Sequence, residues 1–407
     1  MTRWFAGATH RRMADSNVIR HRQKLTQSIR ERIPHLSSEV RNAFQIVPRH
    51  LLLRDFHVYS LTGNAERVPY NSRRPSERQL ELIYSDQALG TFLQRGRTIS
   101  STSQPSLVAG MLELLDVHVG QRVLEMGTGT GYNAALIAEI VHDQSLVVSV
   151  DILDSVTSLA RRKLKEAGYG RIPILRRDGF VGAAEHGPFD RIVATVACPD
   201  LSPHWESQLT SDGCIVAPLL HAGWSPIVKI WRDGTRLRGK LSIGAGFVSM
   251  QGQLSKSDPW QHLGPRLPIE LGDASVFAAP AKLLQEHLDV QRLWSSIFHT
   301  DFFLFLSIRS PKAFFSFRPP GYGLYDERVG VVLYTPGSQS LRVVGNPSLR
   351  DTFLRLFDDW YELGRPRISD YELEFRQHGQ EPAANTRGVI ANVVREYYVQ
   401  TVFLHDK

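Results

Sequence analysis

Hydrophobic and polar residues alternate along the middle of the chain in two different rhythms. Short runs of apolar and β-branched residues, which are typical of buried strands, are separated by stretches with an apolar residue every three or four positions, as in helices. The runs are residues 122–125, 146–151, 172–176, 190–196 and 214–218. Strands that alternate with helices at this spacing predict βαβ units and a mostly parallel sheet.

The pattern changes after the fifth run. Two strand-like segments, 226–231 and 236–241, are joined by Asp233-Gly234, a dipeptide that is typical of hairpin turns. A parallel sheet that ends in an antiparallel hairpin is the methyltransferase variant of the doubly wound, Rossmann-like α/β fold. We therefore expect this fold class in the centre of the chain.

Segments of different character flank this region. Residues 20–46 have helical periodicity and Pro34 breaks them into two helices, whereas the stretch from 47 to about 78 is rich in loop residues. Gly and Pro mark residues 252–273 as a linker. The predicted organisation is a helical and loop segment with a basic arm at 1–80, a methyltransferase core at 81–252, a linker at 253–273 and a C-terminal α+β domain at 274–407.

The C-terminal domain is predicted from its own patterns. We expect a helical run at 283–297, strands at 302–308, 329–334 and 397–404, and a helix after Pro347 with Ser348 as its cap and Phe353, Phe357 and Trp360 on one face. The domain is aromatic, since 22 of the 38 Phe, Trp and Tyr lie at or after residue 255. Most of these rings should form its core, and a minority exposed as a peptide-docking surface is the alternative.

Composition narrows the class of protein. With 42% hydrophobic and 22% charged residues over 407 positions, the chain reads as a globular protein. There is no apolar stretch of about 18 residues and no secretory signal, so we expect a cytoplasmic protein without a membrane partner. Cys198 and Cys214 form neither a disulfide framework nor a zinc site, and we expect no metal.

The net charge of +7 is concentrated at the N-terminus. Residues 1–35 hold eight basic residues against Asp15 and Glu31, a balance of +6. Such an arm can meet nucleic acid, an acidic peptide or an acidic surface. The alternative is a solvated helix face with a frayed terminus.

The segment after the first parallel strand carries the strongest chemical signal. Its glycines let the backbone bend tightly and approach a ligand, at the start of a helix whose N-terminus favours negative charge. The segment contains Glu125, Gly127, Thr128, Gly129, Gly131 and Tyr132. Read loosely, it also satisfies the dinucleotide fingerprint.

Two acids sharpen this reading. Asp151 ends the second strand, where a carboxylate can accept hydrogen bonds from both ribose hydroxyls. Asp178 ends the third strand, where it can accept from an adenine amino group, although an Asp-Gly turn is the structural alternative. S-adenosylmethionine needs both contacts, whereas a dinucleotide would need further donors for its pyrophosphate.

Several linked motifs now give the sequence a specific resemblance. Phe44 with 47–50, Tyr84-Ser85-Asp86, residues 97–100, 123–132, Asp178-Gly179, 195–199 and 247–252 occur in the order found in protein-L-isoaspartate O-methyltransferases. The resemblance covers roughly residues 40–252. It implies a class I enzyme that uses S-adenosyl-L-methionine and releases S-adenosyl-L-homocysteine. The cofactor residues that it implies are Thr98, Glu125, Gly127, Thr128, Gly129, Gly131, Tyr132, Asp151, Ile152, Asp178, Gly179 and Thr195.

The sequence departs from that family in two places. The family's catalytic-loop serine is followed one residue later by proline, but here residues 100–105 contain three extra residues, so either Ser100 or Ser103 keeps the family position. The second departure is the long C-terminal domain. Together they resemble the methyltransferases of ribosomal peptides such as lanthipeptides, graspetides and lasso peptides. Those enzymes methylate an aspartate in a modified precursor, and the ester collapses to aspartimide or isoaspartate.

The predicted chemistry needs no catalytic base. An aspartate carboxylate has a reference pKa of about 3.9 and is already ionised at neutral pH, so it needs positioning rather than deprotonation. The hydroxyls of Ser100, Ser101, Thr102 and Ser103 could orient it, unless they form a flexible polar loop. His50, His57 and His118 show no partner pattern and are expected to be surface or core residues.

We therefore expect an aspartate O-methyltransferase that acts on a cyclised ribosomal peptide. The enzyme alternative is a general isoaspartyl repair methyltransferase with an appended domain. The alternative from another class is a nucleic-acid-binding or nucleic-acid-modifying protein that uses the basic arm. The sequence disfavours it, because the fourth strand ends in 195–199 without the Asn/Asp-Pro-Pro-aromatic motif of amino-group methyltransferases.

Overall fold

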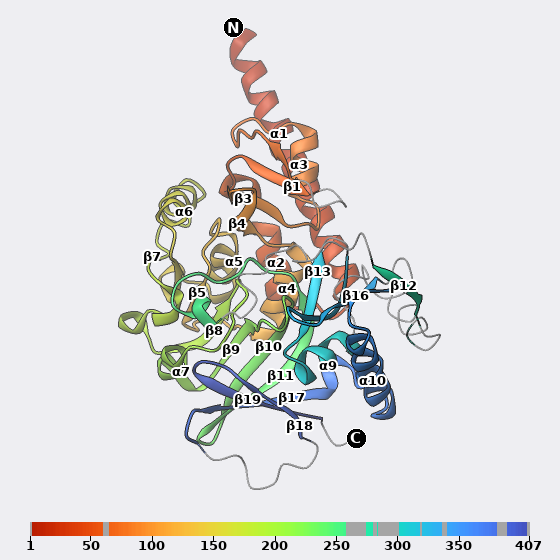
Figure 1. The fold of residues 1–407 in the computed structure, drawn as a ribbon. Coiled ribbons are helices and arrows are strands. Elements are labelled where there is room, and N and C mark those ends of the chain that lie inside the picture. The colour runs from red at the N-terminus through yellow and green to blue at the C-terminus, as the bar shows by residue number, and fades with distance from the viewer. Residues whose placement is uncertain are drawn as a thin grey trace. The chain divides into compact units, whose positions relative to one another are not determined.

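The structure is a computed structural model, and Figure 1 shows its helices and strands. The chain divides into two compact units. The structure describes residues 2–59, 65–257, 274–279, 283, 301–317, 320–335, 340–380 and 389–404. The first unit contains residues 1–196 and 204–216, and the second contains 197–203 and 217–407.

The first unit is built on a parallel sheet. Its strands follow the order β7-β6-β5-β8-β9, which is the 3-2-1-4-5 order of a doubly wound fold. They are β5 (Val123–Met126), β6 (Val147–Asp151), β7 (Ile174–Arg176), β8 (Phe189–Ala194) and β9 (Leu209–Pro218). The connecting helices are α5 (Tyr132–Val141), α6 (Asp154–Glu166) and α7 (Pro203–Gln208), and α4 (Pro105–Leu115) precedes the sheet. The predicted βαβ units are confirmed.

Two helices open the chain, as Pro34 predicts. Helix α1 (Thr2–Arg32) ends just before this proline, and α2 (Ser38–Ile46) begins after Ser37. The Ser37 hydroxyl caps α2 by accepting a hydrogen bond from the backbone N–H of Val40 at 3.3 Å. A short 3₁₀ turn, Arg49–Leu52, follows α2.

The stretch predicted to be rich in loops contains much of a second sheet. Its antiparallel strands follow the order β2-β1-β3-β4. They are β1 (Phe56–Tyr59), β2 (Ala65–Val68), β3 (Leu89–Gln94) and β4 (Arg97–Thr102), and α3 (Glu77–Ile83) lies between β2 and β3. Sequence reasoning missed these strands because they are short and half exposed, so a clean alternation of apolar and polar residues is absent.

The second unit contains two groups of antiparallel strands, one of them part of a ten-stranded sheet and the other a five-stranded sheet. One has the order β18-β19-β17-β11-β10 and includes the predicted hairpin. The two strands of the hairpin pair with each other up to Asp233 and Arg236, which face each other at the turn. Its strands are β10 (Ser225–Asp233), β11 (Arg236–Ala245), β17 (Tyr371–Gln377), β18 (Val389–Val394) and β19 (Tyr398–Leu404). The other sheet has the order β12-β16-β15-β14-β13. Its strands are β12 (Ser275–Ala278), β13 (Ala313–Phe317), β14 (Pro320–Asp326), β15 (Gly330–Thr335) and β16 (Ser340–Gly345). Strands β15 and β19 confirm the predictions at 329–334 and 397–404.

Helix α9 (Asp301–Arg309) corrects one prediction, because residues 302–308 were expected to form a strand. The run is apolar and almost wholly buried, and a short continuous apolar run does not distinguish a strand from a buried helix by periodicity. The predicted helix at 283–297 lies outside the described residues except for Leu283.

Helix α10 (Ser348–Glu362) is confirmed, but its predicted cap is wrong. Ser348 lies inside the first turn, and the Asn346 side chain accepts a hydrogen bond from the Ser348 N–H at 2.9 Å. Phe353 and Phe357 of α10 pack edge-on against Phe302 of α9, with ring centroids 5.5 and 5.0 Å apart. These contacts support the core reading of the aromatic residues.

Among the described residues, no helix is at once long enough and apolar enough to cross a membrane. In the same part of the chain, no three His, Cys, Asp or Glu side chains gather closely enough to hold a metal ion. Both Cys198 and Cys214 are buried thiols.

Candidate active site

The glycine loop, residues 127–131, leaves the carboxyl end of β5 and leads into α5. Gly127 has a φ of +96°, and a Cβ there would lie 2.8 Å from Thr195 Oγ1 and 2.9 Å from Val196 Cγ1. The Thr195 hydroxyl donates a hydrogen bond to the Gly127 carbonyl at 2.9 Å. The end of β8 therefore fixes the first turn of the loop, and only glycine fits that turn without strain.

A buried polar network supports the loop from below. Glu125 is fully buried and accepts hydrogen bonds from Ser149 Oγ at 2.5 Å and from Asn133 Nδ2 at 2.8 Å. Thr128 Oγ1 pairs with Ser149 Oγ at 2.7 Å. Burial raises the pKa of Glu125 to about 7, although these two donors oppose the rise. Glu125 thus braces the loop, and its direct contact with a cofactor stays a prediction.

Asp151 lies at the carboxyl end of β6, beside the loop. Its carboxylate accepts hydrogen bonds from the N–H groups of Leu153 at 3.1 Å and Gly129 at 3.3 Å. Burial raises the pKa of Asp151 above its ordinary value, and these backbone donors lower it. Ile152 follows directly and is half-buried. The carboxylate is therefore positioned by the loop itself.

Asp178 lies one strand further along, after β7. Its carboxylate accepts a hydrogen bond from the Phe180 N–H at 2.9 Å, across a 3₁₀ turn that begins at Gly179. This is the turn that the structural alternative predicted, and it also holds the side chain at the carboxyl edge of the sheet. The adenine contact of Asp178 stays a prediction.

These residues fit an adenosyl cofactor. Ligands of doubly wound sheets bind at the carboxyl ends of the strands where the strand order reverses, and here that point lies between β5 and β8. The loop presents backbone rather than side chains, and Asp151 offers carboxylate oxygens for hydroxyl donors. The Tyr132 hydroxyl is buried without a hydrogen-bond partner in the described part of the chain, so a bound group could satisfy it.

Strand β4 (Arg97–Thr102) lies against the glycine loop, and we call it the acceptor strand because it carries most of the predicted acceptor hydroxyls. A Cβ on Gly129 would lie 2.9 Å from the Ser101 carbonyl oxygen and 3.9 Å from Ser100 Oγ. Ser100 is buried, and its hydroxyl accepts a hydrogen bond from Thr91 Oγ1 at 3.1 Å. The pairing of β3 with β4 is irregular on either side of Phe92. The segment predicted as a polar loop is therefore a distorted strand edge that meets the cofactor loop.

The four predicted acceptor hydroxyls lie in different surroundings. Thr102 is buried, whereas Ser101 and Ser103 are half-buried. Thr98, predicted as a cofactor residue, contacts the hydroxyl of Tyr59 on β1. Ser100 and Ser103 are the two candidates for the family's serine, and of these Ser100 is the one that lies beside the glycine loop.

Arg49 organises the acceptor side of the site. Its buried guanidinium donates hydrogen bonds to four backbone carbonyls, at 2.8 to 3.2 Å. They belong to Ile83, Ser85, Gln87 and Ser103. The same guanidinium lies 5.5 Å from the ring centroid of Tyr132, the first residue of α5. One side chain thus ties the acceptor segment to the end of the glycine loop.

Asp86 holds the start of α4, which follows the acceptor strand. Its carboxylate accepts hydrogen bonds from the N–H and the hydroxyl of Ser106, both at 2.7 Å, and from Gln104 Nε2 at 3.1 Å. Arg32 Nε of α1 lies 3.0 Å from the same carboxylate. A carboxylate at a helix N-terminus also matches the helix dipole.

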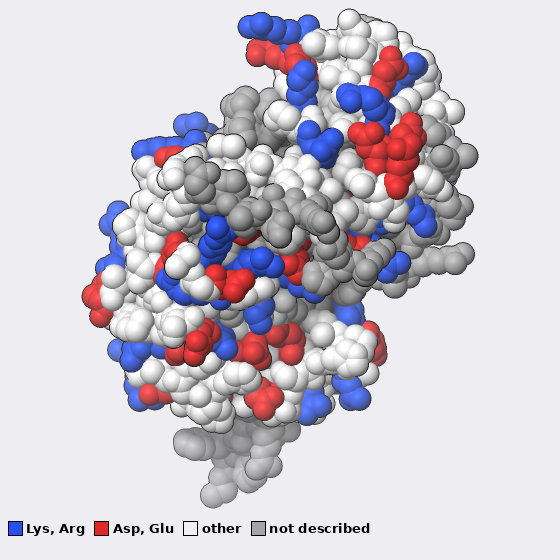
Figure 2. Space-filling view, turned by 90° about the horizontal axis from the view of Figure 1, so that it is seen from below, with Lys and Arg blue, Asp and Glu red and all other residues white. Residues whose placement is uncertain are grey.

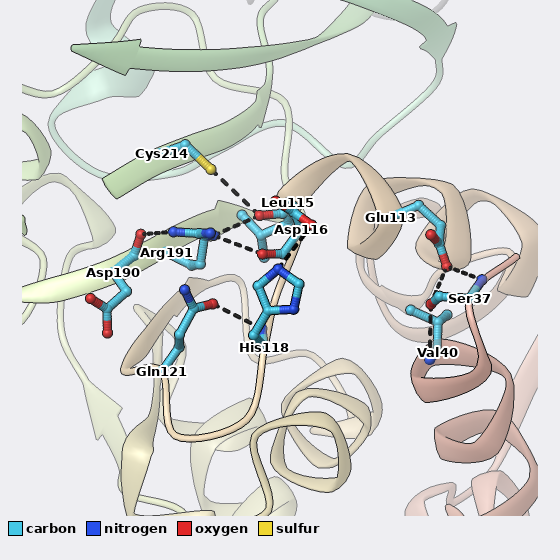
Figure 3. Close-up of polar contacts among 10 residues, drawn as sticks. All are labelled: Ser37, Val40, Glu113, Leu115, Asp116, His118, Gln121, Asp190, Arg191 and Cys214. Atoms are coloured by element: carbon cyan, nitrogen blue, oxygen red, sulfur yellow. Dashed lines mark hydrogen bonds and ion pairs between the residues drawn. The ribbon is translucent and has the colours of Figure 1, made fainter. Parts of the chain in front are cut away.

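Helix α4 is fixed along its length as well (Figure 3). Glu113 accepts hydrogen bonds from the N–H of Ser37 at 2.9 Å and from its hydroxyl at 2.7 Å, which links α4 to the cap of α2. At the other end, Arg191 Nε donates to the carbonyls of Leu115 at 2.8 Å and Asp116 at 3.0 Å. The acceptor strand is therefore followed by a helix that hydrogen bonds hold against α2 and β8.

Sequence reasoning did not assign roles to Arg49 and Asp86. Both lie in segments that carry the family resemblance, which was the available signal, but a hydrogen bond to carbonyls 34 to 54 residues away leaves no local pattern. His50 is a core residue, one of the two locations that were expected for it. It pairs with the Tyr84 hydroxyl at 2.7 Å, and burial lowers its pKa to about 4.

Comparisons with known proteins agree with this geometry. A family model described as Protein-L-isoaspartate(D-aspartate) O-methyltransferase matches residues 20–255. Protein-L-isoaspartate O-methyltransferase 1 of Archaeoglobus fulgidus is 36% identical over 198 residues, which cover 49% of this chain and 79% of the relative. The Methanopyrus kandleri protein-L-isoaspartate O-methyltransferase is 32% identical over 249 residues, or 60% of this chain and 98% of the relative.

A solved structure titled protein-L-isoaspartate O-methyltransferase shares the fold, with a TM-score of 0.51 and 21% identity. It covers 87% of this chain and 96% of its own, so the likeness in fold extends beyond residues 20–255. This chain belongs to the protein-L-isoaspartate(D-aspartate) O-methyltransferase family, the S-adenosylmethionine-dependent carboxyl methyltransferases of proteins and peptides.

Proposed function

We propose that the chain methylates an aspartate side-chain carboxylate in a cyclised ribosomal peptide. The observation that carries this proposal is the altered acceptor segment. It is three residues longer than the family pattern, and it forms a distorted strand whose Ser100 lies beside Gly129. In this proposal the strand faces the methyl acceptor, so its change in length would alter the part of the site that selects between carboxylates.

The residues of this chain would act by positioning. Bound S-adenosylmethionine supplies a methyl group on an electrophilic sulfonium. The Ser100 hydroxyl can donate a hydrogen bond to one oxygen of the acceptor carboxylate, which leaves the other oxygen free to attack. Arg49 and Asp86 hold the strand and α4 in place, and no base is needed because the carboxylate is already ionised.

The ester then reacts within the peptide. The backbone nitrogen of the following residue attacks the ester carbonyl, methanol leaves, and a five-membered aspartimide ring forms. Hydrolysis of that ring gives aspartate or isoaspartate. A constrained peptide would favour one conformation for this ring closure.

A general isoaspartyl repair methyltransferase is the second candidate. A specific observation favours it: a structure titled protein-L-isoaspartate O-methyltransferase covers 87% of this chain. The C-terminal part therefore does not by itself separate this chain from repair enzymes.

The nucleic-acid alternative has less support. Of the four arginines on α1 whose side chains the structure describes, Arg20, Arg22 and Arg32 have partners within the protein. On the face drawn in Figure 2, basic side chains lie among acidic ones. We therefore favour a peptide over a nucleic acid as the partner.

Competition between substrates tests the proposal. Labelled S-adenosylmethionine is supplied with three peptides: a macrocyclic peptide that contains aspartate, its linear form, and an unstructured isoaspartyl peptide. The proposal predicts the highest kcat/KM for the macrocycle and release of methanol as aspartimide forms. A higher kcat/KM for the isoaspartyl peptide, with no methylation of either aspartyl peptide, would establish the repair function instead.

A further inference from the structure

A polar groove lies between α1 and α2 in the first unit. Its volume is about 460 Å³, within the range of about 300–1,000 Å³ that is usual for ligand pockets. Two guanidinium groups and four carboxamides line it: Arg30, Arg41, Gln23, Gln27, Asn42 and Gln45. The two helices pack against each other here, so the groove is part of one folded unit.

The two arginines in the groove differ from their neighbours on α1. Arg22 donates hydrogen bonds to the carbonyls of Gln45 and Ile46, at 2.7 and 2.9 Å. Arg20 and Arg32 form ion pairs with acidic side chains of the same unit. Among the described residues, no hydrogen bond or ion pair joins the side chain of Arg30 or Arg41, although hydrogen bonds and, to a smaller extent, the charge of Arg41 lower the pKa of the nearby Glu39 carboxyl. Both guanidinium groups that line the groove therefore keep their N–H donors available for a ligand.

The other side chains of the groove indicate what would accompany a negative charge. A carboxamide offers both a donor and an acceptor, as a peptide bond does, so Gln23, Asn42 and Gln45 can pair with an extended backbone. The side-chain nitrogen of Gln27 already donates to Glu31 at 3.0 Å, which leaves mainly its oxygen for a ligand. A guanidinium can pair with a carboxylate through two parallel hydrogen bonds. None of the lining residues is aromatic, which removes the stacking platform that single-stranded nucleic acids use.

The groove is also connected to the acceptor side of the site. Arg32, two residues after Arg30, pairs with Asp86, which holds the start of α4. Helix α2 continues through residues 47 and 48 to Arg49, which binds the Ser103 carbonyl. Both helices of the groove therefore end at residues that support the acceptor segment.

We infer that this groove binds an acidic segment of the peptide substrate, outside the residue that is methylated. The inference rests on the proposed function, because it takes the ligand to be a peptide. Arg30 and Arg41 would pair with side-chain carboxylates of that segment, while the carboxamides would hold its backbone. The groove would then lower KM without taking part in methyl transfer.

Binding of peptides that cannot be methylated tests the inference apart from activity. Two labelled peptides carry asparagine at the acceptor position and differ only in their flank, which contains glutamate in one and glutamine in the other. Fluorescence anisotropy then compares the full-length protein with the double variant Arg30→Gln/Arg41→Gln. The matched control is Arg162→Gln/Arg171→Gln, which removes two exposed arginines elsewhere in the unit.

We expect the groove variant to raise the Kd of the glutamate peptide about fivefold, and this loss should shrink as salt rises. The glutamine peptide and the control variant should show no change. Equal losses in both double variants, or no loss in either, would overturn the inference. So would a single-stranded RNA oligonucleotide whose binding depends on Arg30 and Arg41 while the glutamate peptide binds as before.

The methylation assay distinguishes failure of the groove inference from failure of the proposed function. If the groove variant binds the glutamate peptide normally but the macrocycle is still methylated, the groove inference fails and the proposed function stands. If only unstructured isoaspartyl peptides are methylated, the proposed function fails, while the difference in Kd still shows acidic-segment binding.

Discussion

The glycine loop and the acceptor strand meet at Gly129, yet different atoms hold each of them in place. The loop is fixed by its own backbone dihedral angles and by contacts that reach into the parallel sheet, such as Thr195 on Gly127. The acceptor strand is fixed by side chains from outside it, since the guanidinium of Arg49 binds the Ser103 carbonyl and Asp86 binds Ser106.

This difference explains where the sequence can vary. The loop leaves no space for a side chain at Gly127, so its length and composition are constrained by geometry. The acceptor strand already tolerates an irregular ladder next to Phe92. Extra residues can therefore enter the acceptor side while the cofactor side keeps its form.

Replacing Arg49 should have the largest effect. Arg49→Met keeps most of the volume but leaves four buried or partly buried carbonyls without their donor, at a cost of about 3 kcal/mol or more in the free energy of unfolding. Urea unfolding measures that loss. In the variant that remains folded at low temperature, turnover should fall while the Kd for S-adenosylmethionine stays within about twofold.

Calorimetry of cofactor binding is the decisive measurement for this variant. If the Kd rises as much as turnover falls, the contact between Arg49 and Tyr132 couples the two sides, and the comparison between them breaks down.

The cofactor side is tested by Gly127→Ala. The new Cβ meets Thr195 and Val196 at less than 3 Å and imposes a φ of +96°, at a combined cost of about 2–3 kcal/mol. We expect cofactor binding to weaken about 50-fold. Gly168→Ala is the matched control, because Gly168 has a φ of +93° but no atom near the added carbon. Equal loss of cofactor affinity in both variants would show that contacts at Gly127 do not matter.

The same contrast shows what could be predicted from the sequence. The parallel strands, the break at Pro34 and the hairpin at Asp233-Gly234 follow from local periodicity and turn chemistry, and all were found. The acceptor strand was expected to be a loop, because its serines and threonines carry no apolar alternation and its pairing depends on β3. Residues 302–308 were misassigned for the opposite reason, since every position there except Ser307 is apolar and the run fits either element.

Roles carried by distant partners were beyond sequence reasoning. The four carbonyls that Arg49 binds lie 34 to 54 residues further along the chain. Resemblance to a family pointed to the segment that contains Arg49, but it did not indicate that the Arg49 guanidinium donates hydrogen bonds to these carbonyls. The position of Ser100 against Gly129 likewise required the fold.

Glu125 gives the loop a dependence on pH. Its pKa of about 7 in the folded state is higher than the ordinary value of 4.5. Its contribution to stability is therefore fully present below about pH 4.5 and is lost as pH rises towards 7, by about 3 kcal/mol. Glu125→Gln removes this loss, so the variant should gain stability relative to the parent between pH 4.5 and 7 and hold that gain above pH 7. Thermal unfolding at pH 5 and pH 8 measures it, and parallel pH profiles for the two proteins would contradict the assignment.

The smallest expected effect separates two neighbouring serines on the acceptor side. Ser100→Ala removes the hydroxyl that lies beside Gly129, so turnover should fall about tenfold through the loss of one oriented donor. Ser103→Ala keeps the backbone carbonyl that Arg49 binds, so it should change turnover less than about twofold. Single-turnover methylation with saturating peptide measures both variants. Ser100→Cys keeps a weak donor in place of the hydroxyl, so its turnover should fall less than that of Ser100→Ala. If Ser103→Ala is the slower variant, the three extra residues lie before the family serine, and the acceptor carboxylate binds beside a residue three positions closer to α4 than proposed.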